Sequence, residues 1–269
     1  MGLDIIIPTK GKTDYLFKCL RSIIDKTSID YHVHVADTGS TKQEFTDIVK
    51  FLTNNFRDKR NASIYQYDYY NFAKINNHVV KNYCDNDVLL FCNNDIELID
   101  SCVDELYAVA RDDTVGTVGC RLLFEDGSVQ HAGQIAFTHR PDGWPFPQDK
   151  LEVTHRGLRT RKRFKSRESV LGNTAALMCV ETIKFNQVHG FNTRYNECFE
   201  DVEFNMELLL AGYNNTYIDD YSATHAESVS RTKSAEAMEK LKRDYIDNLY
   251  PFWKQLSTDQ QQIITDFKV

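Results

Sequence analysis

A carboxylate that follows an apolar run is the first candidate for chemistry in this sequence. The stretch "DVLLFCNNDIELID", residues 87–100, is apolar from its second residue to Cys92 and continues with Asn93, Asn94 and Asp95. Hard divalent cations take oxygen ligands and often join one or two carboxylates to substrate phosphates. Asp95 therefore suits a metal site, but Asn and Asp are also common in plain surface turns. The segment by itself leaves both interpretations open.

The sequence lacks the familiar phosphate-binding loops. No GxGxxG follows the first apolar run, so a dinucleotide-binding Rossmann site is unsupported. No GxxxxGK[ST] is present, which excludes a P-loop NTPase. Any phosphate must therefore be bound in another way, and a metal ion can serve.

Composition narrows the class of protein. The 269 residues suffice for one large α/β domain or two small ones. The net charge of −7 lacks the excess of positive charge that is typical of nucleic-acid-binding proteins. No apolar run approaches the length that a bilayer requires, and no charged-then-apolar leader opens the chain. Seven scattered cysteines without a CxxC pair are typical of reduced thiols. We therefore expect a cytoplasmic protein with no transmembrane segment and no nucleic-acid partner.

Strand-like and helix-like segments alternate four times in the first 110 residues. The expected strands are 4–8, 31–37, 62–68 and 87–93, and the expected helices are 12–25, 41–52, 71–83 and 100–110. This alternation predicts right-handed βαβ units and a mostly parallel sheet with helices on both faces. Such sheets bind ligands at the carboxyl ends of their strands. Asp37 and Asp95 each close a strand, so we expect them at the same edge.

The pattern changes after residue 112. Two strand-like runs flank Asp126-Gly127, a strong hairpin signal. Residues 138–167 have no periodicity and hold three of the five prolines, which predicts a functional flap or a disordered loop. Further expected elements are a strand at 172–180, a helix at 199–213, a strand at 214–220 and an amphipathic helix at 234–256 interrupted by Pro251.

The order of motifs resembles the family 2 glycosyltransferases from about Asp4 to Arg231. The segments that carry the resemblance are "PTK", "ADTGST", "YNFAKINNHVV", "LLFCNNDIEL", "GNTAAL", "GFNTRYNECFEDVEFNMELLLAGY" and a histidine before "SVSR". The resemblance implies an α/β GT-A fold, with a mostly parallel central sheet flanked by helices. It also implies a GT-A domain at 1–232, divided into a nucleotide-binding half, 1–112, and an acceptor-binding half, 113–232. Residues 233–269 would form a C-terminal helical extension.

The resemblance assigns seven residues to a nucleotide-sugar donor. They are Pro8, Thr9, Asp37, Lys74, Asn77, Asn94 and Arg231. Asp37 matches the acid that accepts hydrogen bonds from a uracil or thymine ring, with an Asx-turn as the alternative. Lys74 would offset phosphate charge, or lie on a solvated helix face. Asn94 would approach the ribose, and Arg231 would touch phosphate or be a plain exposed arginine.

The resemblance also implies a metal site that binds Mn²⁺ or Mg²⁺. Asp95 would be its carboxylate ligand, because Asn93 stands where a DxD motif has its first aspartate. His225 follows a strand and matches a histidine that ligates the metal or contacts the diphosphate in related enzymes. A lone histidine is more often structural, so that alternative stays open.

The catalytic base implied by the "FED" motif is Asp201. Attack by an acceptor hydroxyl requires a group that takes its proton, and a carboxylate at a rigid helix start suits that task. The alternative is that Glu200 and Asp201 merely favour the positive end of a helix dipole. Asn173, Thr174 and Glu200 lie on the side expected to bind the acceptor.

We therefore expect an inverting glycosyltransferase that moves a hexose, from a UDP-sugar or else dTDP-rhamnose, to a saccharide, glycolipid or glycoprotein. Two alternatives are a non-catalytic GT-A-like binding or assembly protein and a sugar-phosphate nucleotidyltransferase. The latter would need a Gly- and Arg-rich loop after the first strand, which "PTKGKTDYLF" lacks. The basic run 156–167 is either solvated or recognises an anionic acceptor or a membrane surface. The apolar face of the 234–256 helix either packs on the domain, which is favoured, or forms a homo-oligomer contact.

Overall fold

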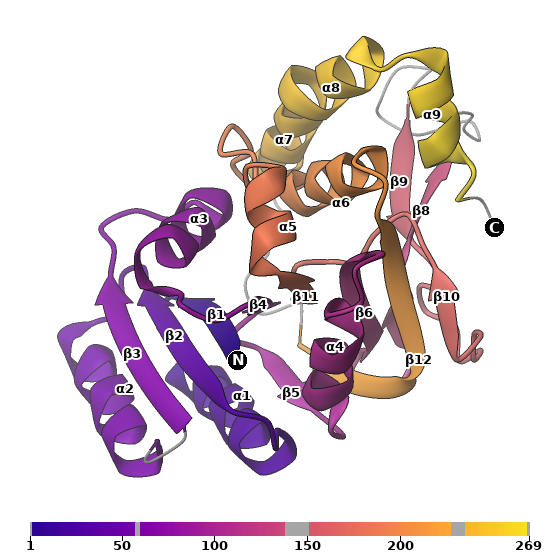
Figure 1. The fold of residues 1–269 in the computed structure, drawn as a ribbon. Helices are drawn as coiled ribbons and strands as arrows, with labels where there is room; N and C mark the ends of the chain where they lie inside the picture. The colour runs from indigo at the N-terminus through magenta and orange to yellow at the C-terminus, as the bar shows by residue number, and fades with distance from the viewer. Residues whose placement is uncertain (1, 57–59, 138–150, 227–234, 268–269) are drawn as a thin grey trace.

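The computed structural model describes residues 2–56, 60–137, 151–226 and 235–267. Its strands are β1 (Leu3–Thr9), β2 (Tyr31–Asp37), β3 (Arg60–Gln66), β4 (Val88–Cys92), β5 (Ile96–Leu98), β6 (Val115–Leu123), β7 (Val129–His131), β8 (Gln134–Phe137), β9 (Glu152–His155), β10 (Arg167–Ser169), β11 (Leu177–Glu181) and β12 (Asn214–His225). Its helices are α1 (Thr13–Lys26), α2 (Lys42–Asn55), α3 (Phe72–Tyr83), α4 (Cys102–Ala110), α5 (Thr182–Gln187), α6 (Glu200–Leu210), α7 (Ala235–Asp244), the π-helix η2 (Tyr245–Leu249), α8 (Tyr250–Gln255) and α9 (Thr258–Thr265). Figure 1 shows their arrangement.

The N-terminal half of the sheet is parallel, as predicted. Strands β3, β2, β1 and β4 lie side by side in that order, and each neighbouring pair is parallel. The register pairs Thr9 of β1 with Asp37 of β2. The ends of β1, β2 and β4 therefore meet at one edge of the sheet.

The second half of the sheet is mixed in direction. Strand β11 is antiparallel to both β4 and β6, and β12 is parallel to β6. The short strands β5 and β10 pair with β12 in antiparallel fashion. The hairpin predicted at Asp126-Gly127 is confirmed, because β6 and β7 pair antiparallel on either side of it and Gly127 has a φ of 76°.

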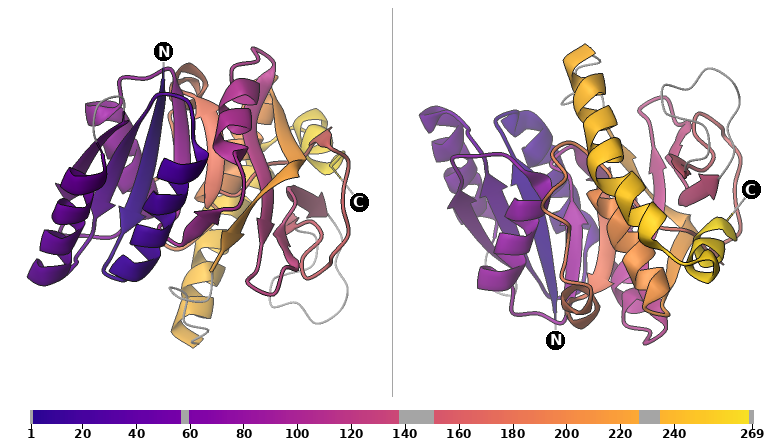
Figure 2. Two further views of the ribbon diagram at one scale, coloured as in Figure 1. Left: turned by 90° about the horizontal axis from the view of Figure 1, so that it is seen from below. Right: turned by 90° about the horizontal axis from the view of Figure 1, so that it is seen from above.

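Helices cover both faces of the sheet because its strands are apolar on both sides. Ile5 and Ile7 belong to a core shared with α1, α2 and α4, whereas Ile6 belongs to a core shared with α3, α5 and α6. Adjacent residues of a strand point to opposite faces, which explains this division. Figure 2 shows the helices on the two faces. Among the described helices, none is long and apolar enough to cross a bilayer.

The C-terminal helices pack on the domain, as favoured from the sequence. Tyr245, Leu249 and Trp253 are at most 5% exposed and share a core with Val202 and Met206 of α6. Full burial of a large apolar side chain stabilises the folded state by roughly 1.5–3 kcal/mol relative to leaving it exposed.

Two predictions about local structure are wrong. Pro251 does not interrupt the C-terminal helix, because α7, η2 and α8 follow one another without a gap and Leu249 and Tyr250 keep helical backbone angles. The wider π-helical turn η2 lies directly before the proline, whose ring would clash with a carbonyl four residues back in a regular α-helix. Residues 151–167 are not structureless either, since β9 pairs with β8 and joins Gln134 to His155. A four-residue strand among prolines and basic residues is too short to give a periodic signal. Residues 138–150 of that predicted loop lie outside the described part of the chain.

Candidate active site

A cavity of about 570 Å³ opens at the carboxyl edge of the parallel strands. Eight of the residues assigned from the sequence line it: Pro8, Thr9, Asn94, Asp95, Thr174, Glu200, Asp201 and His225. They come from segments far apart in the sequence, namely the ends of β1 and β4, the turn before β11, the start of α6 and the end of β12. The fold therefore brings most of the predicted site together.

Strand pairing explains why Asp95 and His225 meet. In the antiparallel pair of β5 and β12, His225 lies opposite Ile96, the residue next to Asp95. The carboxylate Oδ1 of Asp95 is 3.2 Å from Nε2 of His225, and the two side chains are only 7% and 9% exposed. The backbone N–H of Ala226 donates to the carbonyl of Asp95 at 3.2 Å, which fixes the pair further.

Gln130 orients the imidazole of His225. The Oε1 atom of Gln130 is 2.6 Å from His225 Nδ1, and its Nε2 donates to the carbonyl of His225 at 3.2 Å. An amide oxygen can only accept, so Nδ1 carries a proton, and Nε2 faces Asp95 and the amide Nδ2 of Asn93, which is 3.2 Å away. The sequence analysis missed Gln130, which lies in the three-residue strand β7 without a motif of its own.

This pair suits a divalent cation. Two electron-rich atoms facing each other at 3.2 Å repel unless a proton or a cation joins them. Adjacent ligands of an octahedral ion with bonds of about 2.1 Å are about 3.0 Å apart, close to the separation seen here. Asp95 and His225 could therefore hold one ion and leave its other positions to water and phosphate oxygens.

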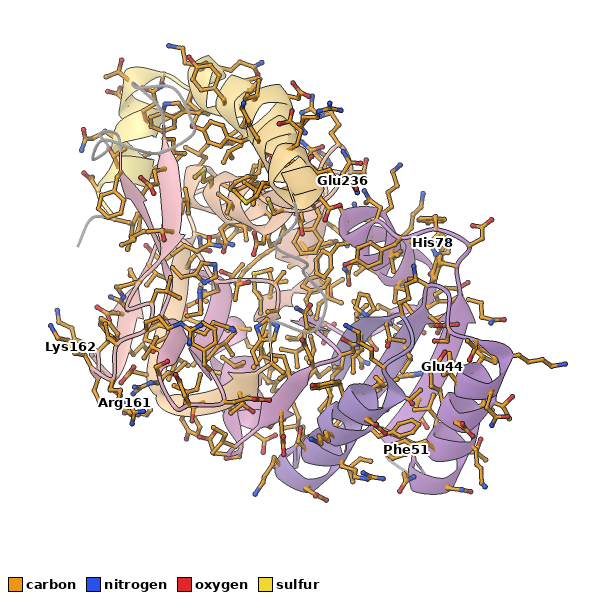
Figure 3. The ribbon with its side chains drawn as sticks, turned by 180° about the vertical axis from the view of Figure 1, so that it is seen from behind. Glu44, Phe51, His78, Arg161, Lys162 and Glu236 are labelled. Atoms are coloured by element: carbon orange, nitrogen blue, oxygen red, sulfur yellow. The ribbon has the colours of Figure 1, made fainter. Side chains whose placement is uncertain are left out.

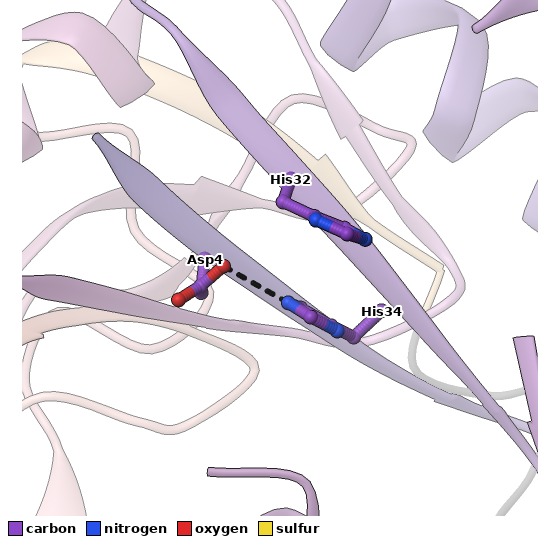
Figure 4. A group of neighbouring side chains, drawn as sticks. All are labelled: Asp4, His32 and His34. Carbon is purple, nitrogen blue, oxygen red and sulfur yellow. Dashed lines mark hydrogen bonds and ion pairs between the residues drawn. The ribbon is translucent and has the colours of Figure 1, made fainter. Parts of the chain in front are cut away.

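A second group of Asp and His side chains lies at the other end of the strands. Ligand atoms of Asp4, His32 and His34 all lie within 4.8 Å of one another (Figure 4). The two rings are stacked, with centroids 4.2 Å apart and planes only 7° from parallel, so their lone pairs do not converge. Nε2 of His34 contacts Asp4 at 2.9 Å, and Nε2 of His32 contacts Ser63 at 2.9 Å. This group would bind a metal only after a ring turned.

Asp201 lies in the first turn of α6 and is fixed by the segment opposite. The backbone N–H of Ala175 donates to its Oδ2 at 3.1 Å. Among the described residues, Oδ1 has no hydrogen-bond partner, and the side chain lines the cavity. The acidic first turn of α6 also agrees with the helix dipole, so the structure accommodates both interpretations of Asp201.

A histidine pair, of which His155 lines the cavity, was not predicted from the sequence. The N–H of Thr174 donates to Nε2 of His131 at 3.4 Å, and the Nδ1 atoms of His131 and His155 are 2.9 Å apart. Burial, followed by the neighbouring His155, holds the pKa of His131 well below its usual value. Neutral His131 can therefore donate from Nδ1 to His155, which lines the cavity.

Four predicted residues do not line the cavity. Asp37 is 1% exposed and accepts from the N–H and hydroxyl of Ser40, three residues on, so it holds the turn after β2. Asn77 binds both backbone polar groups of Phe191, at 2.7 and 3.0 Å. Lys74 lies on the exposed face of α3. Asn173 is fully buried and donates to Thr117 and to the carbonyl of Thr216.

The remaining predictions concern Arg231 and the basic run. Arg231 lies outside the described residues. In the basic run, Arg156 pairs with Glu168 at 2.7 Å, and Arg163 pairs with Asp219 at 2.8 Å. Figure 3 places Arg161 and Lys162 at an outer edge of the molecule. Much of the charge is thus matched by carboxylates, which favours a structural role for this run.

Comparisons with known proteins agree with this arrangement. The family model described as Glycosyl transferase family 2 matches residues 4–181. The chain is 29% identical over 239 residues to the O-antigen biosynthesis protein RfbC of Myxococcus xanthus, covering 87% of this chain and 18% of RfbC. The chain spans 18% and 27% of the two curated relatives reported, so it corresponds to a small part of each.

Solved structures share the fold at low identity. GalNAc-T7 with UDP, GalNAc and Mn²⁺ aligns with a TM-score of 0.63 and 10% identity, over 99% of this chain and 54% of that one. The mannosyltransferase PcManGT from Pyrobaculum calidifontis, in complex with GDP-Man and Mn²⁺, aligns with a TM-score of 0.60 and 11% identity, over 98% and 73%. The match to more than half of the chain, together with this fold, shows that the chain belongs to glycosyl transferase family 2 and has the GT-A fold of that family of enzymes.

Proposed function

We propose that this chain is an inverting, metal-dependent hexosyltransferase that uses a nucleoside-diphosphate sugar as donor. The observation that carries the proposal is that the Asp95–His225 pair and Asp201 line the same cavity. A metal site and a base in one cavity are what this reaction requires. The Mn²⁺ in the structures of GalNAc-T7 and PcManGT supports the same interpretation.

The donor would lie along the strand ends. Thr9 and Asn94, whose side chains are joined by a 2.8 Å hydrogen bond, would border the ribose and base. Pro8 and Asp37 would limit the base pocket, with Asp37 acting through the turn that it holds. Asp95 and His225 would hold the Mn²⁺ or Mg²⁺, which neutralises charge on the departing diphosphate when bound.

Transfer would take place in one displacement. The acceptor hydroxyl oxygen forms a bond to the anomeric carbon while the bond from that carbon to the diphosphate oxygen breaks. Oδ1 of Asp201 takes the hydroxyl proton and later releases it to solvent. Attack on the face opposite the leaving group inverts the configuration at that carbon, and the products are the glycosylated acceptor and a nucleoside diphosphate.

The identities of the donor and the acceptor are proposed on less direct grounds than the reaction. We favour a UDP-hexose, with dTDP-rhamnose second, because both carry a pyrimidine base. The name of RfbC supports a saccharide or glycolipid acceptor, with a glycoprotein as the alternative. Thr174 and Glu200 would face that acceptor. A cytoplasmic location, contact with a membrane surface and self-association remain predictions.

A panel of nucleotide sugars tests the proposal without knowledge of the acceptor. Each donor is incubated with the chain and Mn²⁺, and release of the nucleoside diphosphate is followed by chromatography. We expect slow hydrolysis of one donor. Both EDTA and the substitution Asp95→Ala should abolish this hydrolysis, and the variant protein should stay folded. If no donor is bound or hydrolysed in the presence of Mn²⁺, the chain is a non-catalytic member of the family. Hydrolysis unaffected by both EDTA and Asp95→Ala would remove the metal from the proposal.

A further inference from the structure

The loop at residues 191–199, which leads into α6 just before Glu200 and Asp201, is anchored by side chains from other elements. Asn77 of α3 binds the N–H and the carbonyl of Phe191. Glu203 of α6 accepts from the hydroxyl of Tyr195 at 2.5 Å. These contacts fix the first half of the loop and leave its second half to be held in another way.

Asp244, the last residue of α7, holds the second half. Its carboxylate accepts from three consecutive backbone N–H groups, those of Asn196 at 3.0 Å, Glu197 at 2.7 Å and Cys198 at 3.2 Å. Asp244 is 2% exposed, so these charge-assisted hydrogen bonds form away from water. All three loop residues line the cavity. A buried carboxylate of the C-terminal extension thus shapes the cavity wall from behind.

The next residue shows why the loop needs this support. Phe199 precedes α6 with a φ of 78°, in the left-handed region that a non-glycine residue occupies at a cost of about 1–3 kcal/mol. Its ring packs edge-on against Tyr245, the residue after Asp244, with centroids 5.9 Å apart. The extension therefore stabilises the strained turn that sets where α6 begins and where Asp201 lies.

We propose that Asp244 is a positioning residue for the transfer reaction, and that the C-terminal extension is a working part of the active site. This inference rests on the proposed function, because it assigns Asp244 to holding the proposed base in place. The extension lies outside the residues 4–181 that the family model matches. Among the described residues, it also contributes Leu241 to the wall of the cavity.

The substitution Asp244→Asn removes the charge and keeps the size of the side chain. An amide offers one oxygen, and its NH₂ group meets N–H donors that need acceptors. The loop must then shift, and a misplacement of about 1 Å near a reacting group can lower the rate on the order of 10²-fold. The proposed metal ligands lie in the turn after β4 and at the end of β12, so donor and metal binding should be retained.

The experiment compares Asp244→Asn with Asp247→Asn, a matched loss of charge at an exposed position three residues further along. We expect kcat for nucleoside diphosphate release to fall about 10–100-fold in Asp244→Asn with an unchanged donor KM, and to stay unchanged in the control. Hydrogen exchange at the backbone N–H groups of residues 196–198 should become faster in Asp244→Asn and stay unchanged in the Asp247→Asn control. Asp244→Glu, which keeps the charge but lengthens the side chain, should bind UDP with Mn²⁺ normally and also lose kcat.

Each other result contradicts the proposal. Unchanged kcat in the folded Asn and Glu variants would remove Asp244 from the active site. Parallel loss of UDP binding and activity would mean that Asp244 serves the fold as a whole. Exchange at 196–198 and UDP binding need no turnover, so they separate failure of this inference from failure of the proposed function.

Discussion

Replacing Asp201 by Asn separates catalysis from binding. The variant keeps an oxygen for the N–H of Ala175, which now donates to Oδ2 at 3.1 Å, but it cannot take a proton at the other position. A positioned base contributes about 10²–10⁴-fold to a rate, which corresponds to roughly 3–5 kcal/mol in the activation barrier. We therefore expect kcat for transfer to fall by 10²–10⁴-fold.

Folding should change far less than catalysis in this variant. One negative charge leaves the first turn of α6, where the helix dipole stabilises it by about 0.3–1 kcal/mol, and Glu200 and Glu203 remain there. For a chain of this size, that loss lowers the Tm by about 1–4 °C. UDP binding in the presence of Mn²⁺ should not change, because Asp95 and His225 are untouched.

The assay measures transfer from the identified donor to its acceptor, with Glu200→Gln as the matched control. Both residues lie in the same turn and line the same cavity, so the two variants differ only in which carboxylate is lost. If Glu200→Gln abolishes transfer while Asp201→Asn retains most of it, the base is Glu200. If both variants stay active, neither carboxylate takes the proton and the proposed mechanism is refuted.

Three further predictions address the metal, the charge balance and the extension. Gln130→Leu removes the acceptor for Nδ1 of His225 and should weaken Mn²⁺ binding about 10–100-fold in a titration with UDP; unchanged affinity would mean that Gln130 does not orient the ring. Burial, followed by the charge of Glu203, raises the pKa of Glu207 to about 7, so the folded state binds the proton more tightly and loses stability as pH rises from about 4.5 through 7. Glu207→Gln should thus raise the Tm at pH 8 but not at pH 4, by an amount equivalent to about 1–3 kcal/mol, and an equal effect at both values would contradict this. Deleting residues 235–269 should expose the core under α6 and give an aggregated protein on size-exclusion chromatography, whereas a soluble, active monomer would show that the extension is dispensable.

The parallel half of the fold was predictable because β1 and β4 contain continuous apolar runs ended by polar residues, and because its strands alternate with helical patterns. That pattern placed Asp95 at the correct edge of the sheet. The contact of Asp95 with His225 depends instead on β5, a three-residue strand whose pairing with β12 joins residues far apart in the chain. Such short segments carry too few residues for a periodic signal.

The residues that support the site were the hardest to predict. Gln130 and His155 lie in strands of three and four residues, and each contacts a histidine from another strand. In the sequence, Asp244 cannot be told apart from the other charged residues of its helix, because the three N–H groups that it binds belong to a loop more than forty residues earlier. A side chain that serves the backbone of a distant segment leaves no local pattern. The candidate ligand and base were therefore predictable from the sequence, whereas the residues that orient them were not.

The most direct test of the central claim is a crystal structure with UDP and Mn²⁺, in which anomalous scattering locates the metal. We predict one peak in the cavity, about 2.0–2.6 Å from a carboxylate oxygen of Asp95 and from Nε2 of His225, with the diphosphate completing the coordination. A peak at Asp4 and His34 instead, or UDP bound in the cavity with no metal beside Asp95, would contradict the proposed site.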